Sequence, residues 1–239
     1  MSELLCIENV SKSFGKNKVF DKFNLKIGKG KIVGLISPNG SGKTTLIKLI
    51  MELIKVDEGT ITVDGKKSGA ETRNVISYLP DHSIFSKNDK ISYAVSFYED
   101  AYKDFDKAKC EKYLRIFKID LNTRFSSLSK GTAEIVNLVL TLSRNARLYL
   151  IDEPLASVDP VNREAIITTI LKEFKEDSTV IISTHLLNEV EMILDEIIML
   201  KDNKLYCHKS VEAIREETGK SLNEFFKDSF RTSCLGGDE

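Results

Sequence analysis

Residues 32–50 read IVGLISPNGSGKTTLIKLI, and they carry the most informative pattern in the chain. An apolar segment leads into a loop of glycine, proline and small polar residues, and an amphipathic segment follows the loop. Glycines adopt positive φ angles without strain, so Gly40 and Gly42 let consecutive backbone N–H groups face one anion. The stretch predicts a phosphate-binding loop between a buried strand and a helix. We expect the apolar face of that helix to run from Leu46 to Ile54 and to include Leu53.

Outward from this loop, apolar strands alternate with helical patterns. Two segments before it, residues 4–14 and 19–27, predict an N-terminal antiparallel layer. The alternation after the loop predicts a mainly parallel sheet that helices cover on both faces. The later strands are expected at 59–65, 75–80, 147–151 and 178–183 and in a hairpin at 196–209, with helices at 160–176 and 186–194.

One long segment departs from this alternation. Residues 83–145 show helical patterns and no convincing strand, which predicts a helical lobe. A chain of 239 residues suits one large domain with such a lobe. We expect a core (1–82 and 146–208), a helical subdomain (83–145) and a C-terminal helical tail (209–239).

Polar residues stand at the ends of three predicted strands. The first strand ends in the glycine loop, a second in Asp152 and Glu153, and a third in Thr184 and His185. Ligands of such sheets gather beyond the carboxyl ends of the strands. The sequence therefore predicts a ligand site where these three ends meet.

Charge and composition exclude several classes of protein. The 35 basic and 36 acidic residues give a net charge of −1, so no overall field attracts nucleic acid and no nucleic-acid partner is expected. The four cysteines form no C-x-x-C pair, which argues against a zinc or redox site and fits a reducing compartment. No apolar run is long enough to cross a membrane, so any membrane segment would belong to another polypeptide.

Three motifs together carry a family resemblance. SPNGSGKTT, residues 37–45, resembles the Walker A loop, and LYLIDEP, residues 148–154, resembles Walker B. SSLSKGTAEIVNL, residues 126–138, resembles the signature motif of the ABC ATPases. The matches extend over roughly residues 3–230, so the chain resembles an ABC ATPase of the P-loop NTPase fold class. That resemblance implies an α/β fold with a central, mainly parallel sheet, an N-terminal antiparallel layer and a helical lobe.

The resemblance also implies ATP and Mg²⁺ as cofactors and gives each motif a role. Lys43 would contact the β- and γ-phosphates, Glu153 would act as general base, and His185 would contact the γ-phosphate. Phe14 occupies the position that stacks on adenine, and the signature would face ATP on the opposite protomer. The implied ATP-binding residues are Phe14, Ser37, Pro38, Asn39, Gly40, Ser41, Gly42, Lys43, Thr44, Thr45, Ser129 and Gly131; the metal residues are Thr44, Asp81 and Asp152; the catalytic residues are Glu153 and His185; and the dimer or coupling residues are Leu128, Lys130 and Asp159.

Several positions depart from the family pattern. Ser37 stands where Walker A usually begins with glycine, and Asp81 stands where the family carries its Q-loop glutamine. In the signature, Lys130 and Thr132 replace the usual glycine and glutamine. These departures leave turnover and signature strength open.

The function implied by the resemblance is that of an ATP-binding subunit. Two such subunits would close on ATP and open after hydrolysis, which drives transport through a separate permease at the cytoplasmic face of the membrane. The C-terminal tail resembles that of bacterial exporters of drugs, peptides or lipids. Two alternatives stay open: a weakly hydrolysing or regulatory half of a heterodimer, and a soluble ABC ATPase not linked to transport. A GTPase is not expected, because the Asn-Lys-x-Asp motif is absent.

Overall fold

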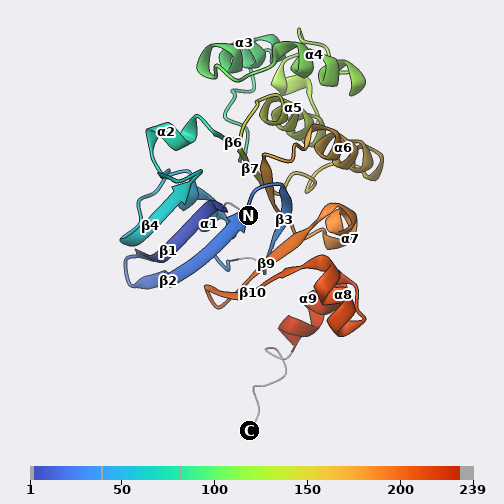
Figure 1. Ribbon diagram of the computed structural model, residues 1–239. Helices are drawn as coiled ribbons and strands as arrows, with labels where there is room; N and C mark the ends of the chain where they lie inside the picture. The colour runs from blue at the N-terminus through green and yellow to red at the C-terminus, as the bar shows by residue number, and fades with distance from the viewer. Residues whose placement is uncertain (1–2, 39, 81, 232–239) are drawn as a thin grey trace.

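The computed structural model describes residues 3–38, 40–80 and 82–231. Two sheets lie side by side, a group of helices lies beyond one end of the larger sheet, and two further helices lie near the other end (Figure 1). This arrangement confirms the α/β prediction with an N-terminal antiparallel sheet and a mainly parallel one. Within the described ranges, no helix combines the length and apolar character that crossing a membrane requires.

The larger sheet has six strands in the order β10-β9-β3-β8-β7-β6. Five of them run parallel, and β10 pairs antiparallel with β9 in the predicted hairpin. The residues of the five parallel strands are mostly buried, because helices and the second sheet cover both faces, whereas β10 at the edge is exposed or partly exposed. The strands are β3 (Lys31–Ile36), β6 (Ile76–Leu79), β7 (Leu148–Asp152), β8 (Thr179–Ser183), β9 (Glu196–Lys201) and β10 (Lys204–Ser210).

The smaller sheet is antiparallel, with the order β2-β1-β4-β5. The turn between β4 and β5 uses Asp64 and Gly65 at positive φ, as the Asp-Gly pair predicts. The strands are β1 (Glu3–Phe14), β2 (Asn17–Gly28), β4 (Glu58–Val63) and β5 (Lys66–Lys67).

Helix α1 (Lys43–Ile50) packs between the two sheets. The sequence prediction extended its buried face too far, because α1 ends at Ile50 and Leu53 is 54% exposed. Glu52 adopts a φ of 53°, and the Leu53 N–H donates to the Lys48 carbonyl at 2.9 Å. This is the hydrogen-bond pattern of a Schellman end, usually marked by glycine. A glutamate there gives the sequence no sign that the helix stops.

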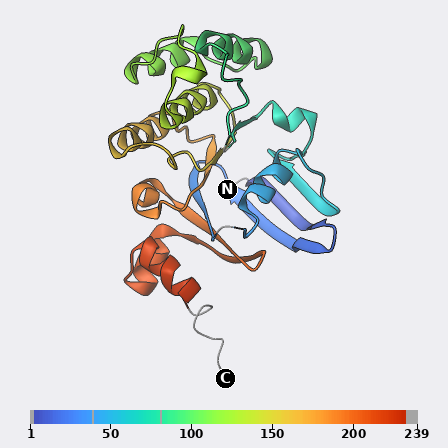
Figure 2. The same ribbon diagram turned by 180° about the vertical axis from the view of Figure 1, so that it is seen from behind.

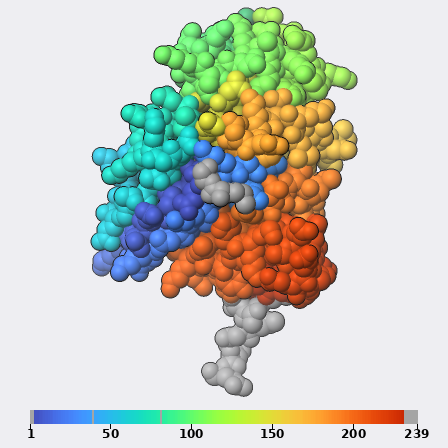
Figure 3. All heavy atoms as spheres, viewed as in Figure 1, coloured from blue at the N-terminus to red at the C-terminus, as the bar shows by residue number. Residues whose placement is uncertain are grey.

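The helical lobe forms the upper part of Figure 1 and the green region of the surface in Figure 3. Its helices are α3 (Ile91–Ala101), α4 (Lys107–Ile116), the 3-10 turn η1 (Phe125–Ser127) and α5 (Lys130–Leu142). Residues 82–145 contain no strand, only isolated bridges such as Lys90 with Arg124, so the predicted lack of strands is confirmed for this part of the chain. The exact bounds of the subdomains stay a prediction.

Of the remaining helices, α2 follows β5 of the smaller sheet, and the others follow β7, β8 and β10 of the larger sheet. From behind, α6 lies directly below the lobe (Figure 2). The expected helix at 186–194 is broken in two, α7 and the 3-10 turn η2, because the Val190 backbone (φ −106°, ψ −14°) interrupts it. These elements are α2 (Ala70–Arg73), α6 (Pro160–Glu173), α7 (Leu187–Val190), η2 (Glu191–Ile193), α8 (Val211–Thr218) and α9 (Leu222–Arg231).

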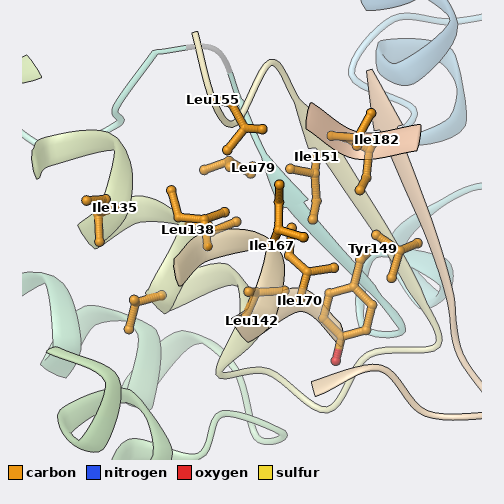
Figure 4. Packing of buried hydrophobic residues seen from close by; sticks show 14 of the residues in the cluster. Leu79, Ile135, Leu138, Leu142, Tyr149, Ile151, Leu155, Ile167, Ile170 and Ile182 are labelled. Atoms are coloured by element: carbon orange, nitrogen blue, oxygen red, sulfur yellow. The ribbon is translucent and has the colours of Figure 1, made fainter. Parts of the chain in front are cut away.

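One hydrophobic cluster joins the lobe to the sheet. Leu138 and Leu142 of α5 and Ile167 and Ile170 of α6 face Ile151 of β7 (Figure 4). All of these side chains are at most 7% exposed, so the packing fixes the position of α5 relative to β7. The signature and Walker B motifs lie on these two elements.

Candidate functional site

The glycine loop follows β3 and leads directly into α1. Gly40 and Gly42 adopt φ angles of 82° and 94°. A Cβ on Gly42 would lie 2.9 Å from the Phe20 ring, so the site needs glycine both for its backbone angle and for space. No side chain caps α1, which leaves the N–H groups of its first turn without a capping acceptor. A loop and helix of this kind can bind a polyphosphate through backbone donors.

Lys43 is the cation of the loop and is only 8% exposed. Its Nζ donates to the carbonyls of Ser37 at 2.7 Å and Pro38 at 3.4 Å. Burial lowers the pKa of Lys43, while the charges of Glu153 and Asp152 act in the opposite direction. A phosphate beside this ammonium would oppose the effect of burial and favour the charged form.

Ser37 is buried at the start of the loop, and its Oγ has no hydrogen-bond partner among the described residues. Its φ is not positive, so the backbone there does not require the glycine that Walker A usually has. The cost of serine at this position is the unpaired buried hydroxyl, on the order of 1–3 kcal/mol.

Asp152 ends β7 and is 3% exposed. Its Oδ2 accepts a hydrogen bond from the Thr44 hydroxyl at 3.2 Å, and its Oδ1 accepts one from the Ser183 hydroxyl. A hydroxyl and a carboxylate at this separation are hard oxygen donors of the kind that Mg²⁺ prefers. No larger group of metal-ligating side chains was found in residues 3–38, 40–80 and 82–231, so phosphate oxygens and water would complete the shell.

Glu153 lies directly after Asp152 and adopts a φ of 51°. Its backbone N–H donates to the Ser183 carbonyl at 3.0 Å. Its Oε2 lies 2.9 Å from Nδ1 of His185, whose side chain is 58% exposed. The two side chains therefore meet at the carboxyl ends of β7 and β8, as the pattern of strand ends predicts.

A pocket of about 300 Å³ brings most of these groups together. Phe14, half exposed at the end of β1, forms part of its wall with Val19. The glycine loop, the start of α1 and the two carboxylates form the rest. An aromatic ring, backbone donors, an ammonium group and two carboxylates are the chemical groups that a nucleoside triphosphate with its metal ion requires. The full lining is Phe14, Val19, Gly40, Gly42, Lys43, Thr44, Thr45, Asp152 and Glu153.

The signature residues lie at the start of α5 and do not line this pocket. The Ser129 Oγ caps the helix by accepting from the Thr132 N–H at 3.1 Å, and it lies 2.8 Å from the Thr132 hydroxyl. A Cβ on Gly131 would lie 2.6 Å from the Ser157 carbonyl oxygen, so only glycine fits there. The Lys130 side chain is 76% exposed.

Asp159 caps α6 and accepts from the Asn162 backbone N–H at 3.1 Å and from its side-chain amide at 2.7 Å. These hydrogen bonds, first the one from the Asn162 side chain, lower the pKa of Asp159. The structure thus shows a helix cap at this position, and the dimer role of Asp159 stays a prediction. The predicted roles of Asn39 and Asp81 concern residues outside the described ranges.

Sequence reasoning missed Ser183. This fully buried serine ends β8 and binds Asp152, and it precedes the two polar residues that were expected at that strand end. Its place at a converging strand end is the signal that could have found it. Thr184, by contrast, is buried and accepts from the Leu186 N–H at 3.0 Å, so it shapes the turn.

Sequence relatives were found across most of the chain. The family model described as ABC transporter matches residues 20–156, more than half of the chain. The ABC transporter ATP-binding protein YtrB of Bacillus subtilis (strain 168) is 31% identical over 215 residues, which cover 88% of this chain and 73% of that protein. The bacitracin transport ATP-binding protein BcrA of Enterococcus faecalis is 28% identical, with coverage of 92% and 73%. The galactose/methyl galactoside import ATP-binding protein MglA of Treponema denticola is 29% identical over 94% of this chain, which spans 49% of that protein.

Solved structures show the same fold. An ATP-binding subunit of an ABC transporter superposes with a TM-score of 0.84 at 26% identity, covering 94% of this chain and 98% of that one. A dimeric ATP-binding cassette in a post-hydrolysis state, bound to ADP and Pi, superposes with a TM-score of 0.76 at 23% identity, covering 86% and 98%. ABC ATPases dimerise, and subunits of this kind generally pair with membrane permeases. The chain therefore belongs to the ABC transporter family, as an ATP-binding subunit that hydrolyses ATP with Mg²⁺.

Proposed function

We propose that two ATPase subunits, each with this pocket, close on ATP to drive a separate membrane permease. The observation that carries the proposal is the division of the motifs. The Walker residues and Phe14 share one pocket, whereas Ser129 and Gly131 lie outside it. A site that needs the signature is then completed by the partner's α5 across a two-fold axis.

Within this proposal the residues of the pocket have separate tasks. The loop N–H groups and Lys43 bind the β- and γ-phosphates, and Phe14 stacks on the base. Thr44 and Asp152 hold Mg²⁺, which when bound neutralises the charge on the phosphate oxygens. Glu153 takes a proton from the attacking water, and His185, 2.9 Å from its carboxylate, orients that carboxylate and contacts the γ-phosphate.

A second pocket supports docking of the permease. About 480 Å³ in volume, it lies between α1, β6 and the helical lobe. Leu53 and Ile84 line it and are 54% and 63% exposed, and Lys48 and Arg73 add positive charge. Exposed apolar side chains at the junction of core and lobe suit an apolar helix that carries an acidic residue. A peripheral position at the cytoplasmic face of the membrane follows from this docking.

Export of a drug, peptide or lipid is the direction that we favour. YtrB and BcrA are each matched over 73% of their own length, and BcrA is named for bacitracin transport. MglA, named for sugar import, is about twice as long as the matched part. The regulatory alternative draws on the sequence departures at Ser37, Asp81 and Thr132. By contrast, Lys43, Asp152 and Glu153 meet in one pocket and favour turnover.

The test of the dimer uses Glu153→Gln. This variant should bind ATP, hydrolyse it at least about 100-fold more slowly, and elute from size-exclusion chromatography as a dimer only when ATP is present. Adding Lys43→Ala in the same chain should abolish both ATP binding and the dimer, which makes it the matched control. If Glu153→Gln hydrolyses ATP at the parent rate, Glu153 is not the base.

The test of the permease uses Ile84→Glu. When the tagged parent chain is affinity-purified from detergent-solubilised membranes, an integral membrane protein should co-purify with it. Ile84→Glu should lose that protein while keeping ATP affinity, and Leu171→Glu, an exposed apolar position on α6, should keep it. If the parent co-purifies with no integral membrane protein, the soluble alternative is favoured.

A further inference from the structure

The end of β1 carries the proposed base-stacking residue at an exposed place. Phe14 is the last residue of the strand and is 50% exposed. It precedes Gly15, which has a φ of 59° in the turn to β2. A ring at such a turn loses conformational freedom when a base stacks on it, unless neighbouring groups hold it beforehand.

Asp57, which lies outside every motif, binds this strand end through both of its carboxylate oxygens. Oδ2 accepts from the Ser13 N–H at 2.7 Å, and Oδ1 accepts from Nζ of Lys12 at 2.7 Å. The Asp57 N–H in turn donates to the Ser11 carbonyl at 3.0 Å. One residue of the loop before β4 thus holds three consecutive residues of β1.

Lys12 connects Asp57 to the ring. Its side chain is 13% exposed, and its Nζ lies 5.5 Å from the centroid of Phe14. That distance is within the range of a cation–π contact. The hydrogen bonds from Lys12 and then from Ser13 lower the pKa of Asp57, so the carboxylate is charged at neutral pH.

We propose that Asp57 and Lys12 are positioning residues for the nucleobase, because they hold Phe14 in place to stack on adenine. The proposal rests on the proposed role of Phe14 in ATP binding. Asp57 fixes the backbone on one side of the ring, and the ammonium of Lys12 fixes the ring itself. Neither residue lines the pocket, so neither contacts the phosphates.

Because Asp57 and Lys12 act only on Phe14, they should affect the part of the affinity for ATP that comes from the base and not the part that comes from the phosphates. The phosphates bind at the start of α1, which Asp57 does not contact. Loss of Asp57 should therefore weaken binding of ATP and leave binding of inorganic tripolyphosphate, which has no base, unchanged. A general structural role for Asp57 would weaken both ligands.

The experiment measures the affinities of Mg-ATP and Mg-tripolyphosphate by calorimetry for the parent and five variants. Phe14→Ala should weaken ATP binding roughly 5- to 10-fold, the lower end for one base stacked on an aromatic ring. Asp57→Ala and Lys12→Met should each lose about 3-fold or more of ATP affinity. Asp57→Asn should fall between the parent and Asp57→Ala, because its amide oxygen still accepts from Ser13 and its charge is lost.

Asp21→Asn is the matched control. Asp21 lies on β2 of the same sheet, is similarly exposed, and pairs with Lys18 at 2.8 Å. The structure records no contact between Asp21 and Phe14, so the Asp21→Asn variant should bind ATP with the affinity of the parent. Thermal unfolding verifies that each variant is folded. If Asp57→Ala does not fold, Lys12→Met and Asp57→Asn test the proposal in its place.

The outcomes separate the positioning role of Asp57 and Lys12 from the base-binding role of Phe14 on which it rests. If Phe14→Ala weakens ATP binding but the Asp57 and Lys12 variants bind ATP like the parent, the positioning role is wrong and the base site stands. If tripolyphosphate binding falls as much as ATP binding, the effect of Asp57 is structural and the positioning role is also wrong. If Phe14→Ala itself binds ATP like the parent, the base site is wrong and the positioning role is lost with it.

Discussion

The Ser183 hydroxyl donates to Oδ1 of Asp152 across two neighbouring parallel strands, β8 and β7. Thr44 contacts the other oxygen of the same carboxylate at 3.2 Å. Both oxygens are thus oriented by hydroxyl groups, one from the start of α1 and one from the end of β8, and the carboxylate is fixed before any metal ion arrives. Outer hydrogen bonds of this kind commonly control metal affinity.

Ser183→Ala should raise the Mg²⁺ concentration that gives half-maximal ATP hydrolysis by about 10-fold, because Asp152 is then free to rotate. The affinity for ATP measured in EDTA should stay at the parent value, which separates this effect from damage to the pocket. Ser77→Ala is the control, since Ser77 is also a buried strand serine and its hydroxyl donates to the Thr141 carbonyl, away from the site. An unchanged Mg²⁺ requirement for Ser183→Ala would show that Thr44 alone suffices to orient Asp152.

His185→Ala should lower kcat by about 100-fold or more and leave the Kd for ATP within about 2-fold of the parent. In the proposed mechanism His185 contacts only Glu153 and the γ-phosphate, whereas the loop N–H groups and Lys43 supply most of the affinity for ATP, so its loss slows hydrolysis more than it weakens binding. Steady-state hydrolysis and equilibrium binding measure the two values. His208→Gln provides the control, because His208 forms a similar 2.9 Å contact with Glu196 in the same sheet and should keep full activity. A normal kcat in His185→Ala would remove His185 from the proposed mechanism.

Thr132→Val should weaken the ATP-dependent dimer several-fold when combined with Glu153→Gln. The oxygens of a partner-bound γ-phosphate can only accept hydrogen bonds, so Ser129 must donate to them. The Thr132 hydroxyl, 2.8 Å away, then donates to Ser129 and holds its hydrogen outward. Analytical ultracentrifugation measures the dimer constant, and Thr132→Ser, which keeps the hydroxyl, should restore it. Equal dimer constants for the valine and serine variants would contradict this role.

Arg144→Met should destabilise the protein by about 3–5 kcal/mol, as removal of one partner from a buried ion pair does. Arg144 is 2% exposed and donates to the Ile76 and Asn74 carbonyls at 2.7 and 2.8 Å and to Asp104 of the lobe. Its loss removes a hydrogen bond from each of the three acceptors. Urea unfolding measures the change in the free energy of unfolding. Arg147→Met is the control: the Arg147 side chain is 40% exposed, so this variant should lower the free energy of unfolding by less than about 1 kcal/mol. A loss below about 1 kcal/mol for Arg144→Met would mean that water replaces its hydrogen bonds.

The sequence predicted most of the strands and the meeting of their ends. The sequence pattern of these strands is strong, because each continuous apolar strand places the polar residues that follow it at the same edge of the sheet, as Asp152 and His185 show. The end of α1 was missed because a glutamate at residue 52 takes a conformation that glycine usually marks. Ser183 and Asp57 were missed because their partners lie far away in the sequence, 31 residues for Ser183 and 44 or 45 for Asp57. Contacts of that range depend on strand order and loop paths, so the strand-end pattern marks the position of Ser183 but not its partner, and no local pattern marks Asp57.

Gly131 lies against the backbone of Ser157, and the Ser157 N–H donates to Glu134 of α5 at 3.1 Å. Ser157 is four residues beyond Glu153, the proposed general base, so the segment that follows this carboxylate is in direct contact with the start of α5. In the proposed dimer the first belongs to one nucleotide and the second to the other. A shift at either nucleotide is then transmitted between Ser157 and the start of α5, so the two reaction centres of the proposed dimer are coupled through each chain.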